Sequence, residues 1–343
     1  MPQSLQEDSR SNMASSTQPD PQIDTTIPTL RRDLTSENVP LARRFRALFS
    51  LKHVASQTPG QQATEAIEAI AAAFDSPSAL LKHELAYCLG QTRNLVAVPF
   101  LRAVLENKEE DAMCRHEAAE ALGALGDMSS LQIMEQMKDD ESEPVVVRET
   151  CEIAVDRINW AHSESRRSES LKSSDFASID PAPPLPLSSE TPSISNLQAT
   201  LLDQSLPLFQ RYRAMFALRD LASPPDLPTA KPAVHALASG FKDPSALFRH
   251  EVAFVFGQLS HPESIPALLA VLEDTKEESM VRHEAAEALG SLGEEPGVED
   301  MLKRFLNDPE QVVRESVVVA LDMAAYEKTG EMEYATIPTE VVV

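Results

Sequence analysis

Hydrophobic residues recur along most of the chain at the three- and four-residue spacing of amphipathic helices. In residues 112–126, AMCRHEAAEALGALG, the side chains of Ala118, Leu122 and Leu125 fall at i, i+4 and i+7 and form one apolar stripe. The preceding stretch NLVAVPFLRAVLEN, residues 94–107, has a second helical pattern, and the KEED sequence between the two predicts a turn. Together the two stretches predict a pair of helices packed through their apolar stripes.

The helical pattern occurs twice in the chain. RHEAAEALGALG at residues 115–126 returns 167 residues later as RHEAAEALGSLG at residues 282–293. RFRALFSL and SPSALLKHELAYCLGQ return at the same offset as RYRAMFAL and DPSALFRHEVAFVFGQ. Only near the end does the register slip by one residue, where VVRETCEIAVD at 146–156 matches VVRESVVVALD at 312–322. The chain is therefore a tandem duplication.

A shorter period runs inside each half, because His83 and His116 are 33 residues apart and their counterparts in the second half repeat that spacing. A period of roughly 30 to 40 residues with two helices per unit is typical of an α-solenoid. We therefore predict an all-α fold, an α-solenoid of about eight helix pairs similar to HEAT repeats, four pairs in each half. Gly123 and Gly126 are expected to end the second helix of their unit.

Stretches of different composition flank and separate the two halves. Residues 1–26 are polar and rich in Ser, Gln and Pro, which predicts a disordered N-terminal tail. Residues 161–195 hold eleven serines and five prolines, which predicts a flexible linker. The N-terminal half then covers residues 27–160, the C-terminal half covers 196–327, and 328–343 form a C-terminal tail.

Composition and charge restrict the classes of function. Aromatic residues make up only 5% of the 343 residues, which favours closely packed helices over a β-sandwich. The formal charge of −24 would repel phosphate backbones, so we expect no nucleic-acid partner and favour a basic protein partner. On the simplest interpretation, much of this negative charge only keeps the protein soluble.

The cysteines and the hydropathy point to a reducing compartment. Cys88, Cys114 and Cys151 form no CxxC pair and lie in apolar helical contexts, so we expect three small buried side chains and neither disulfides nor a thiolate zinc site. The polar start of the chain does not resemble a signal peptide, and no apolar run approaches ~20 residues, so no membrane segment is expected. We expect a cytoplasmic, and also nuclear, protein that is a monomer.

Four adjacent His-Glu pairs are the candidate chemistry. They occur in the two central units of each half and in none of the outer units, and they are His83-Glu84, His116-Glu117, His250-Glu251 and His283-Glu284. His116 lies two positions before Ala118, about 200° around the helix, so it points away from the apolar stripe. We expect the four pairs to line one face, the concave face of the solenoid.

The simplest interpretation of a single His-Glu pair is a solvated surface pair, and duplication could copy such a neutral feature. The other histidines have no counterpart at the 167-residue offset and are interpreted as ordinary surface residues: His53, His162, His235 and His261. Half of the eight histidines nevertheless sit in the repeated pairs.

Imidazole nitrogens and carboxylate oxygens without thiolates suit divalent iron, manganese or zinc. Each half offers two His and two Glu residues, enough for one metal and a spare carboxylate, so two halves that face each other would hold two metals. A pair of irons held in this way could bind O2 and attack an unactivated C–H bond. Two alternatives stay open from the residues alone: a non-catalytic scaffold that binds a protein on its concave face, and a binuclear zinc or manganese hydrolase on the same ligands.

The duplicated solenoid with a KHE or RHE motif at four places resembles the deoxyhypusine hydroxylase family over residues 40–160 and 207–327. The resemblance implies a monooxygenase with a non-haem di-iron centre, two Fe2+ per chain and O2 as co-substrate. It also implies the substrate, a translation initiation factor whose deoxyhypusine side chain is hydroxylated to complete hypusine.

The resemblance carries eight metal ligands onto this sequence: His83, Glu84, His116, Glu117, His250, Glu251, His283 and Glu284. Which carboxylates bind iron directly is open, and we favour Glu117 and Glu284 together with the four histidines. Glu84 and Glu251 are then the candidate catalytic carboxylates that hold the cationic amines of the substrate arm. A positively charged substrate agrees with the acidic composition.

Overall fold

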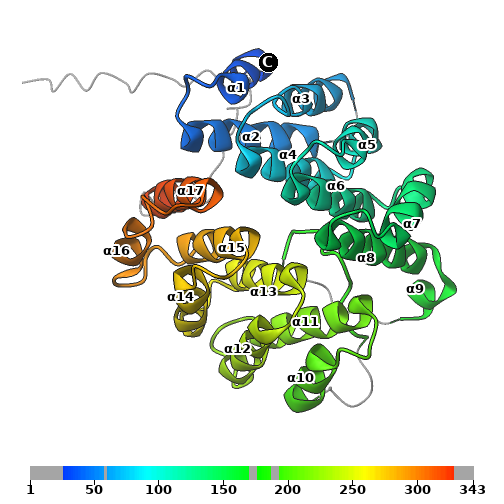
Figure 1. The fold of residues 1–343 in the computed structure, drawn as a ribbon, viewed down its shortest axis with the longest axis vertical. Coiled ribbons are helices and arrows are strands. Elements are labelled where there is room, and N and C mark those ends of the chain that lie inside the picture. Colours follow the sequence, from blue (N-terminus) through cyan, green and yellow to red (C-terminus); the bar gives the residue numbers. More distant parts are fainter. Residues whose placement is uncertain (1–25, 58–59, 170–175, 187–192, 328–343) are drawn as a thin grey trace, which may run out of the picture.

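The computed structural model describes residues 26–57, 60–169, 176–186 and 193–327 (Figure 1). Within these residues the secondary structure is helical, and no strand is formed. The predicted tails at residues 1–26 and 328–343 lie outside the described residues, apart from Thr26. In the described part, no helix is both long and apolar enough to cross a bilayer.

Each half consists of four consecutive helix pairs. The first half contains α1 (Ile27–Thr35), α2 (Leu41–Ala55), α3 (Gln61–Ala71), α4 (Ala79–Gln91), α5 (Val98–Glu106), α6 (Ala112–Leu125), α7 (Leu131–Asp139) and α8 (Val145–His162). The short helix α9 (Glu164–Ser168) follows. The second half contains α10 (Ile194–Leu202), α11 (Leu208–Ala222), α12 (Ala230–Ala238), α13 (Ala246–Leu259), α14 (Ile265–Glu273), α15 (Ser279–Gly290), α16 (Val298–Lys303) and α17 (Gln311–Glu327). The predicted solenoid of eight pairs is confirmed, and the pair read from residues 94–126 is α5 and α6.

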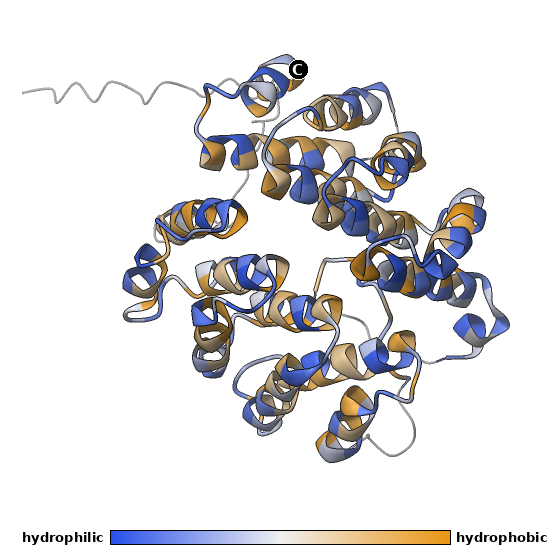
Figure 2. Ribbon diagram, in the orientation of Figure 1, coloured by the Kyte–Doolittle hydropathy of each residue, from blue (hydrophilic) through white to orange (hydrophobic). Residues whose placement is uncertain are grey.

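The second helix of every pair lies on the inside, and these inner helices form a closed ring (Figure 1). Each contacts the next along the chain, from α2 through α4 and α6 to α8, and from α11 through α13 and α15 to α17. The ring closes at two junctions, where α8 contacts α11 and α17 contacts α2. Nearly every helix carries both hydrophobic and hydrophilic residues (Figure 2), as expected where one side faces a neighbour and the other faces water. The closed ring brings the inner faces of the two halves together.

Glycines on the inner helices allow neighbouring backbones to approach closely. A Cβ atom at Gly90 would lie 2.8 Å from the Cα of Ala121, and one at Gly123 would lie 3.0 Å from the Cα of Ala154. Gly123 was expected to end its helix, but it lies inside α6. The left-handed residue that caps α6 is Gly126, with φ of 68°. The glycine at position 123 therefore serves helix contact rather than termination.

We expect the substitution Gly90→Val to lower the free energy of unfolding by about 1–3 kcal/mol, because the new side chain would overlap the backbone of α6. Urea denaturation followed by circular dichroism measures this change. Gly126→Asn is the matched control, since Gly126 has no heavy atom near its Cβ position and Asn tolerates positive φ. An equal or smaller loss at Gly90 would contradict the close approach of α4 and α6.

The arginine of the repeated RHE motif has a structural role. The guanidinium Nε of Arg282 donates to the carbonyl of Leu272 at the end of α14 at 3.0 Å, and its Nη2 lies 2.5 Å from Asp308. Arg115 does the same with Leu105, at 2.9 Å. Because helix ends leave carbonyls without intrahelical partners, each of these buried arginines ties an outer helix to an inner one. The motif therefore combines a structural arginine with a His-Glu pair that faces elsewhere.

Arg282→Ala is expected to destabilise the fold by about 3–5 kcal/mol, because it leaves the Asp308 carboxylate buried without its partner. The midpoint of thermal or urea unfolding measures the loss. Arg304→Ala is the control, since Arg304 pairs with Glu273 on the surface, where both side chains are exposed. A comparable loss in both variants would rule out this role for the buried arginine.

Candidate metal centre

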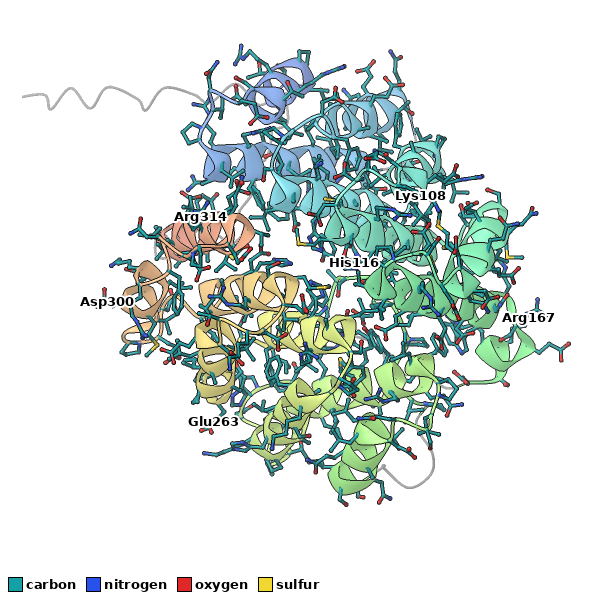
Figure 3. All side chains as sticks on the ribbon, in the orientation of Figure 1. Lys108, His116, Arg167, Glu263, Asp300 and Arg314 are labelled. Atoms are coloured by element: carbon teal, nitrogen blue, oxygen red, sulfur yellow. The ribbon has the colours of Figure 1, made fainter. Side chains whose placement is uncertain are left out.

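The four histidines of the repeated pairs meet at the centre of the ring. His83 comes from α4, His116 from α6, His250 from α13 and His283 from α15. The ring centroid of His83 lies 5.4 Å from that of His116, 5.8 Å from that of His250 and 5.1 Å from that of His283. His116 lies deep inside the molecule, whereas the other labelled side chains in Figure 3 lie at its periphery. Residues 200 positions apart in sequence thus form one cluster.

The face expected to be the concave surface of a solenoid is therefore the buried interface between the two halves. None of the four histidines exposes more than 5% of its surface. An isolated solvated pair, the simplest interpretation of each motif, does not fit this burial.

The imidazole nitrogens in this cluster have no hydrogen-bond partner. Within the described residues, both ring nitrogens of all four histidines are buried and make no hydrogen bond. Buried polar atoms in folded proteins nearly always make a hydrogen bond, so eight nitrogens at one place that make none, with a carboxylate oxygen within 4 Å of only three of them, call for a ligand. Neutral imidazole nitrogens that face one another are the natural donors for a transition-metal ion.

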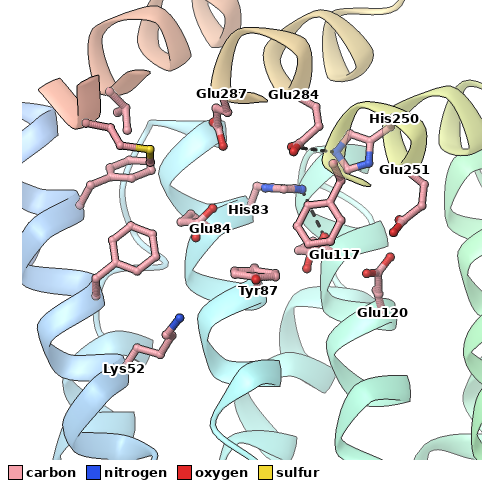
Figure 4. Close-up of a pocket in the computed structure, with 15 residues that line it drawn as sticks. Lys52, His83, Glu84, Tyr87, Glu117, Glu120, His250, Glu251, Glu284 and Glu287 are labelled. Atoms are coloured by element: carbon pink, nitrogen blue, oxygen red, sulfur yellow. Dashed lines mark ion pairs between the residues drawn. The ribbon is translucent and has the colours of Figure 1, made fainter. Parts of the chain in front are cut away.

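Carboxylates from the same motifs approach the imidazoles. Oε2 of Glu117 lies 3.2 Å from Nε2 of His83, and Oε2 of Glu284 lies 3.5 Å from Nε2 of His250. Figure 4 shows both pairs as dashed lines between helices. Among the described residues, three sets of side chains place potential ligand atoms within 4.8 Å of one another. The sets are His83 with His116 and His250; His250 with His283 and Glu284; and His116 with Glu117 and Glu120. Two of these sets contain a carboxylate that directly follows a motif histidine.

Glu84 and Glu251 take a different position in the cluster. Both are buried and line the cavity beside the histidines, but neither belongs to the three sets of converging ligand atoms. One oxygen of Glu84 accepts a hydrogen bond from the thiol of Cys88 at 3.7 Å. Oε1 of Glu251 is buried and, among the described residues, has no hydrogen-bond partner. The eight predicted residues are thus all brought to one site, with Glu84 and Glu251 toward its cavity.

The structure adds Glu120 and Glu287 to the site, which the sequence analysis did not single out. Each lies one helical turn after a motif histidine, and Oε1 of Glu287 lies 3.6 Å from Nδ1 of His283. The signal was present, since the repeated RHEAAEALG sequence holds a second glutamate at i+4 from the histidine, on the same helical face.

A cavity of about 210 Å³ leads to the cluster. Figure 4 shows Glu84, Glu117, Glu251 and Glu287 around it, with Tyr87 beside Glu84 and Lys52 at a distance from the histidines. The remaining lining is apolar and comes mainly from α2, α13 and α17: Phe45, Phe49, Phe254, Val319 and Met323. The site is therefore an acidic pocket with an apolar rim.

Burial shifts the protonation of these groups toward their neutral forms. Burial raises the pKa of Glu84 to about 7, of Glu117 to about 8 and of Glu287 to about 7. Burial also lowers the pKa of His83 and, more strongly, that of His116. A desolvated cluster of carboxyls and neutral imidazoles is stabilised by cations, whether metal ions or the ammonium groups of a substrate.

Among the other histidines, His261 was expected on the surface, but it is only 7% exposed. Its Nδ1 accepts a hydrogen bond from the backbone N–H of Glu263 at 3.1 Å and caps the turn before α14. The expectation was wrong because His was not considered as a helix cap. The three cysteines are buried and free, as predicted.

Comparison with known proteins agrees with the site. The sequence matches the HEAT repeats family over residues 64–154 and 234–322. It is 72% identical over 316 residues to deoxyhypusine hydroxylase of Phaeosphaeria nodorum, covering 92% of this chain and 96% of that protein. It is 69% identical over 328 residues to deoxyhypusine hydroxylase of Aspergillus oryzae, covering 95% of this chain and 97% of that protein.

A solved structure shares the same architecture. Human deoxyhypusine hydroxylase in complex with glycerol superposes with a TM-score of 0.76 and 44% sequence identity, over 88% of this chain and 96% of that one. This chain belongs to the deoxyhypusine hydroxylase family.

Proposed function

We propose that this protein is a deoxyhypusine monooxygenase that uses two Fe2+ ions and O2 to hydroxylate the deoxyhypusine side chain of a translation initiation factor. The observation that carries the metal centre is the set of eight buried imidazole nitrogens without hydrogen-bond partners in the described residues. The names of the relatives support the reaction, since they are deoxyhypusine hydroxylases over nearly the whole chain.

The donor set fits two divalent ions. Each half contributes two imidazoles and one motif carboxylate, which are His83, His116 and Glu117 from the first half and His250, His283 and Glu284 from the second. The second-half set converges within 4.8 Å by itself, whereas His83 and His116 converge with His250 across the interface. Two histidines and one carboxylate per metal, with further positions open, is a ligand set of non-haem iron oxygenases. When bound, the iron pair supplies the oxidising power to insert one oxygen atom of O2 into a C–H bond.

The protein's own residues bind and orient the substrate arm. Deoxyhypusine is a lysine extended by an aminobutyl group, so the arm is a flexible chain that carries positive charge. Glu84 and Glu251 line the cavity without belonging to the converging metal-ligand sets, which suits them to accept hydrogen bonds from the amines. Phe49 and Phe254 on the apolar rim would contact the methylene groups and exclude water.

Glu251→Gln is expected to keep its iron and to raise the KM for the protein substrate at least ~10-fold, because a buried charge partner of the amine is lost. Steady-state kinetics together with iron analysis measure both quantities. Glu106→Gln, an exposed carboxylate on α5, is the control. Loss of iron together with loss of turnover in the Glu251 variant would assign this carboxylate to the metal instead.

The direct test of the reaction is hydroxylation of purified deoxyhypusine-containing initiation factor by the Fe2+-loaded protein under air, with an added chemical reductant that supplies the two electrons per turnover needed to reduce the second oxygen atom of O2 to water. Mass spectrometry is expected to show the mass of one oxygen atom added to the modified lysine. A non-catalytic scaffold would bind the factor and leave its mass unchanged. A zinc or manganese hydrolase would add no oxygen to this C–H bond and would also leave the mass of the factor unchanged.

A further inference from the structure

The duplication predicts two equivalent routes to the metal centre. The cavity described above is lined at the junction of α2 and α17, which we call the open side, by Phe45, Phe49, Lys52, Val319 and Met323. Phe49, Lys52 and Met323 are partly exposed there. The matching sequence positions in the other copy lie at the junction of α11 and α8: Tyr212, Phe216, Arg219, Ile153 and Arg157. Glu251 and Glu120, the counterparts of Glu84 and Glu287 in the duplication, lie near this second junction. A second cavity would be expected there.

That second space is filled by the chain itself. Between Glu120, Ile153, Arg157 and Pro181 a space of about 10 Å³ remains, compared with about 210 Å³ at the open side. The smaller volume holds about one water molecule. A separate groove of about 390 Å³ runs along Ser178 to Asp180, and its lining includes none of the site's histidines or glutamates. Pro181 belongs to residues 176–186, which lie in the stretch predicted to be a flexible linker. We call residues 176–186 the plug.

The centre of the plug is held by an ion pair with the second half. The carboxylate of Asp180 lies 2.7 Å from Nη1 of Arg219, which is fully buried. Nε2 of Gln258 donates to Oδ1 of Asp180 at 3.2 Å and to the hydroxyl of Ser178 at 2.7 Å. The ring of Phe176 lies 4.4 Å from the guanidinium carbon of Arg219. Arg219 occupies the position that Lys52 holds at the open side.

The plug is also bound to the first half. The side-chain oxygen of Gln91 accepts a hydrogen bond from the backbone N–H of Ile179 at 2.7 Å, and its nitrogen donates to the carbonyl of Ile179 at 3.3 Å. Nε of Arg157 donates to the carbonyl of Asp180 at 3.2 Å. Gln91 and Gln258 are themselves counterparts in the duplication, so the plug is held by the same position of both halves. Ala182 is fully buried.

The two junctions close differently as a result. At the open side, Nη2 of Arg46 lies 2.8 Å from Asp322, which joins α2 directly to α17. At the other junction the matching arginine, Arg213, instead donates to the carbonyls of Pro183 and Pro184 in the plug. The plug thus takes part in the second junction as a packed structural element, which its Ser- and Pro-rich composition did not predict.

We propose that residues 176–186 close one of two equivalent routes to the metal centre, so that the substrate arm reaches the centre only between α2 and α17. This inference rests on the proposed function. A duplicated centre open at both sides would accept a cationic arm from two opposite directions. When one side is closed, the arm enters from one direction only. Glu84 and Glu251 then contact different parts of the arm in every turnover.

The test blocks the open side chemically and then releases the plug. Met323→Cys places a thiol on the rim of the open side, and a bulky maleimide attached there would obstruct it. The native cysteines are buried, and burial raises the pKa of Cys88, Cys114 and Cys151, so they are expected to react slowly. Labelled and unlabelled forms of the same iron-loaded protein are compared. Met128→Cys, on an exposed turn, is the labelling control.

With the plug intact, labelling at position 323 is expected to reduce both hydroxylation and the rate of iron removal by bipyridine at least about tenfold. The variant Ile179→Ser/Asp180→Ala is designed to release the plug. When it carries the same label at position 323, bipyridine is expected to remove its iron at least about tenfold faster than from the labelled parent. Arg219 still pairs with Asp220 at 3.1 Å in that variant, so it keeps a partner. Gln91→Ala/Gln258→Ala is a second way of loosening the plug if the first variant does not fold.

Three outcomes separate the claims. Undiminished hydroxylation and iron removal after labelling at position 323 would overturn the single-route proposal. The proposal would also be overturned if both labelled plug-released variants lost iron as slowly as the labelled parent. An unlabelled parent that binds no iron and hydroxylates nothing would refute the proposed function itself.

Discussion

Replacing His116 with alanine is expected to remove iron from the protein and to reduce hydroxylation at least ~100-fold. His116 is fully buried, and its nitrogens converge with those of His83 and His250 within 4.8 Å. Loss of a residue that merely supports a metal ligand costs about 10–100-fold, so loss of a ligand itself should cost at least the upper figure. Iron per chain and turnover of the protein substrate are the two measurements.

His162→Ala is the matched control for this substitution. His162 is exposed and is the last residue of α8, a helix that carries none of the four clustered histidines. It should retain its iron and its activity, and circular dichroism should show that both variants keep their helices. If the two variants lost iron and activity equally, the assignment of the centre to the repeated motifs would be wrong.

Each half expressed alone is expected to fold and to hydroxylate no substrate. Solenoid contacts are made between neighbouring repeats, so residues 26–186, which include the plug, and residues 193–327 should each form helices. Each half, however, supplies only two of the four histidines, and the site requires both inner faces. Helicity of each half and hydroxylation by each half are the measurements.

Mixing the two halves should restore part of the activity, because contacts at the junctions can re-form between separate chains. Ser78 donates to Glu315 at 2.7 Å at one junction, and Ser245 donates to Glu149 at 2.6 Å at the other. Hydroxylation by one isolated half would contradict a centre shared between the two halves.

The helices and their pairing could be predicted from sequence, because they depend on local patterns. Apolar spacing located α5 and α6, and the repeat length indicated four pairs in each half. The duplication also singled out the four histidines. Helix packing alone gives no reason for a His-Glu pair to occur in the central units of each half and not in the outer units. The helix pairs are encoded within about 40 residues, and the duplication is visible directly as sequence identity at the 167-residue offset.

Closure of the ring could not be predicted in the same way. The contact between α17 and α2 depends on small rotations that add up over eight repeats, and no local pattern gives their sum. The predicted concave face thus became a buried interface. Glu120 and Glu287 were missed because a glutamate on a helix usually faces water, and only the closed ring places these two, half-buried, beside the histidines.

The plug was missed for a different reason. A Ser- and Pro-rich segment cannot form its own core, but that composition does not prevent it from docking on surfaces formed by other residues. The partners of Asp180 are Arg219 and Gln258, which lie 39 and 78 residues further along the chain. Only the fold brings them to the segment.

The most direct test of the central claim is the metal content of the freshly purified protein, measured by elemental analysis on samples of known protein concentration. We expect about two iron atoms per chain, because each half contributes two motif histidines and a motif glutamate beside them to the cluster. Protein that is folded and contains no iron, or that binds zinc and does not hydroxylate the factor after iron loading, would contradict a di-iron centre between the two halves.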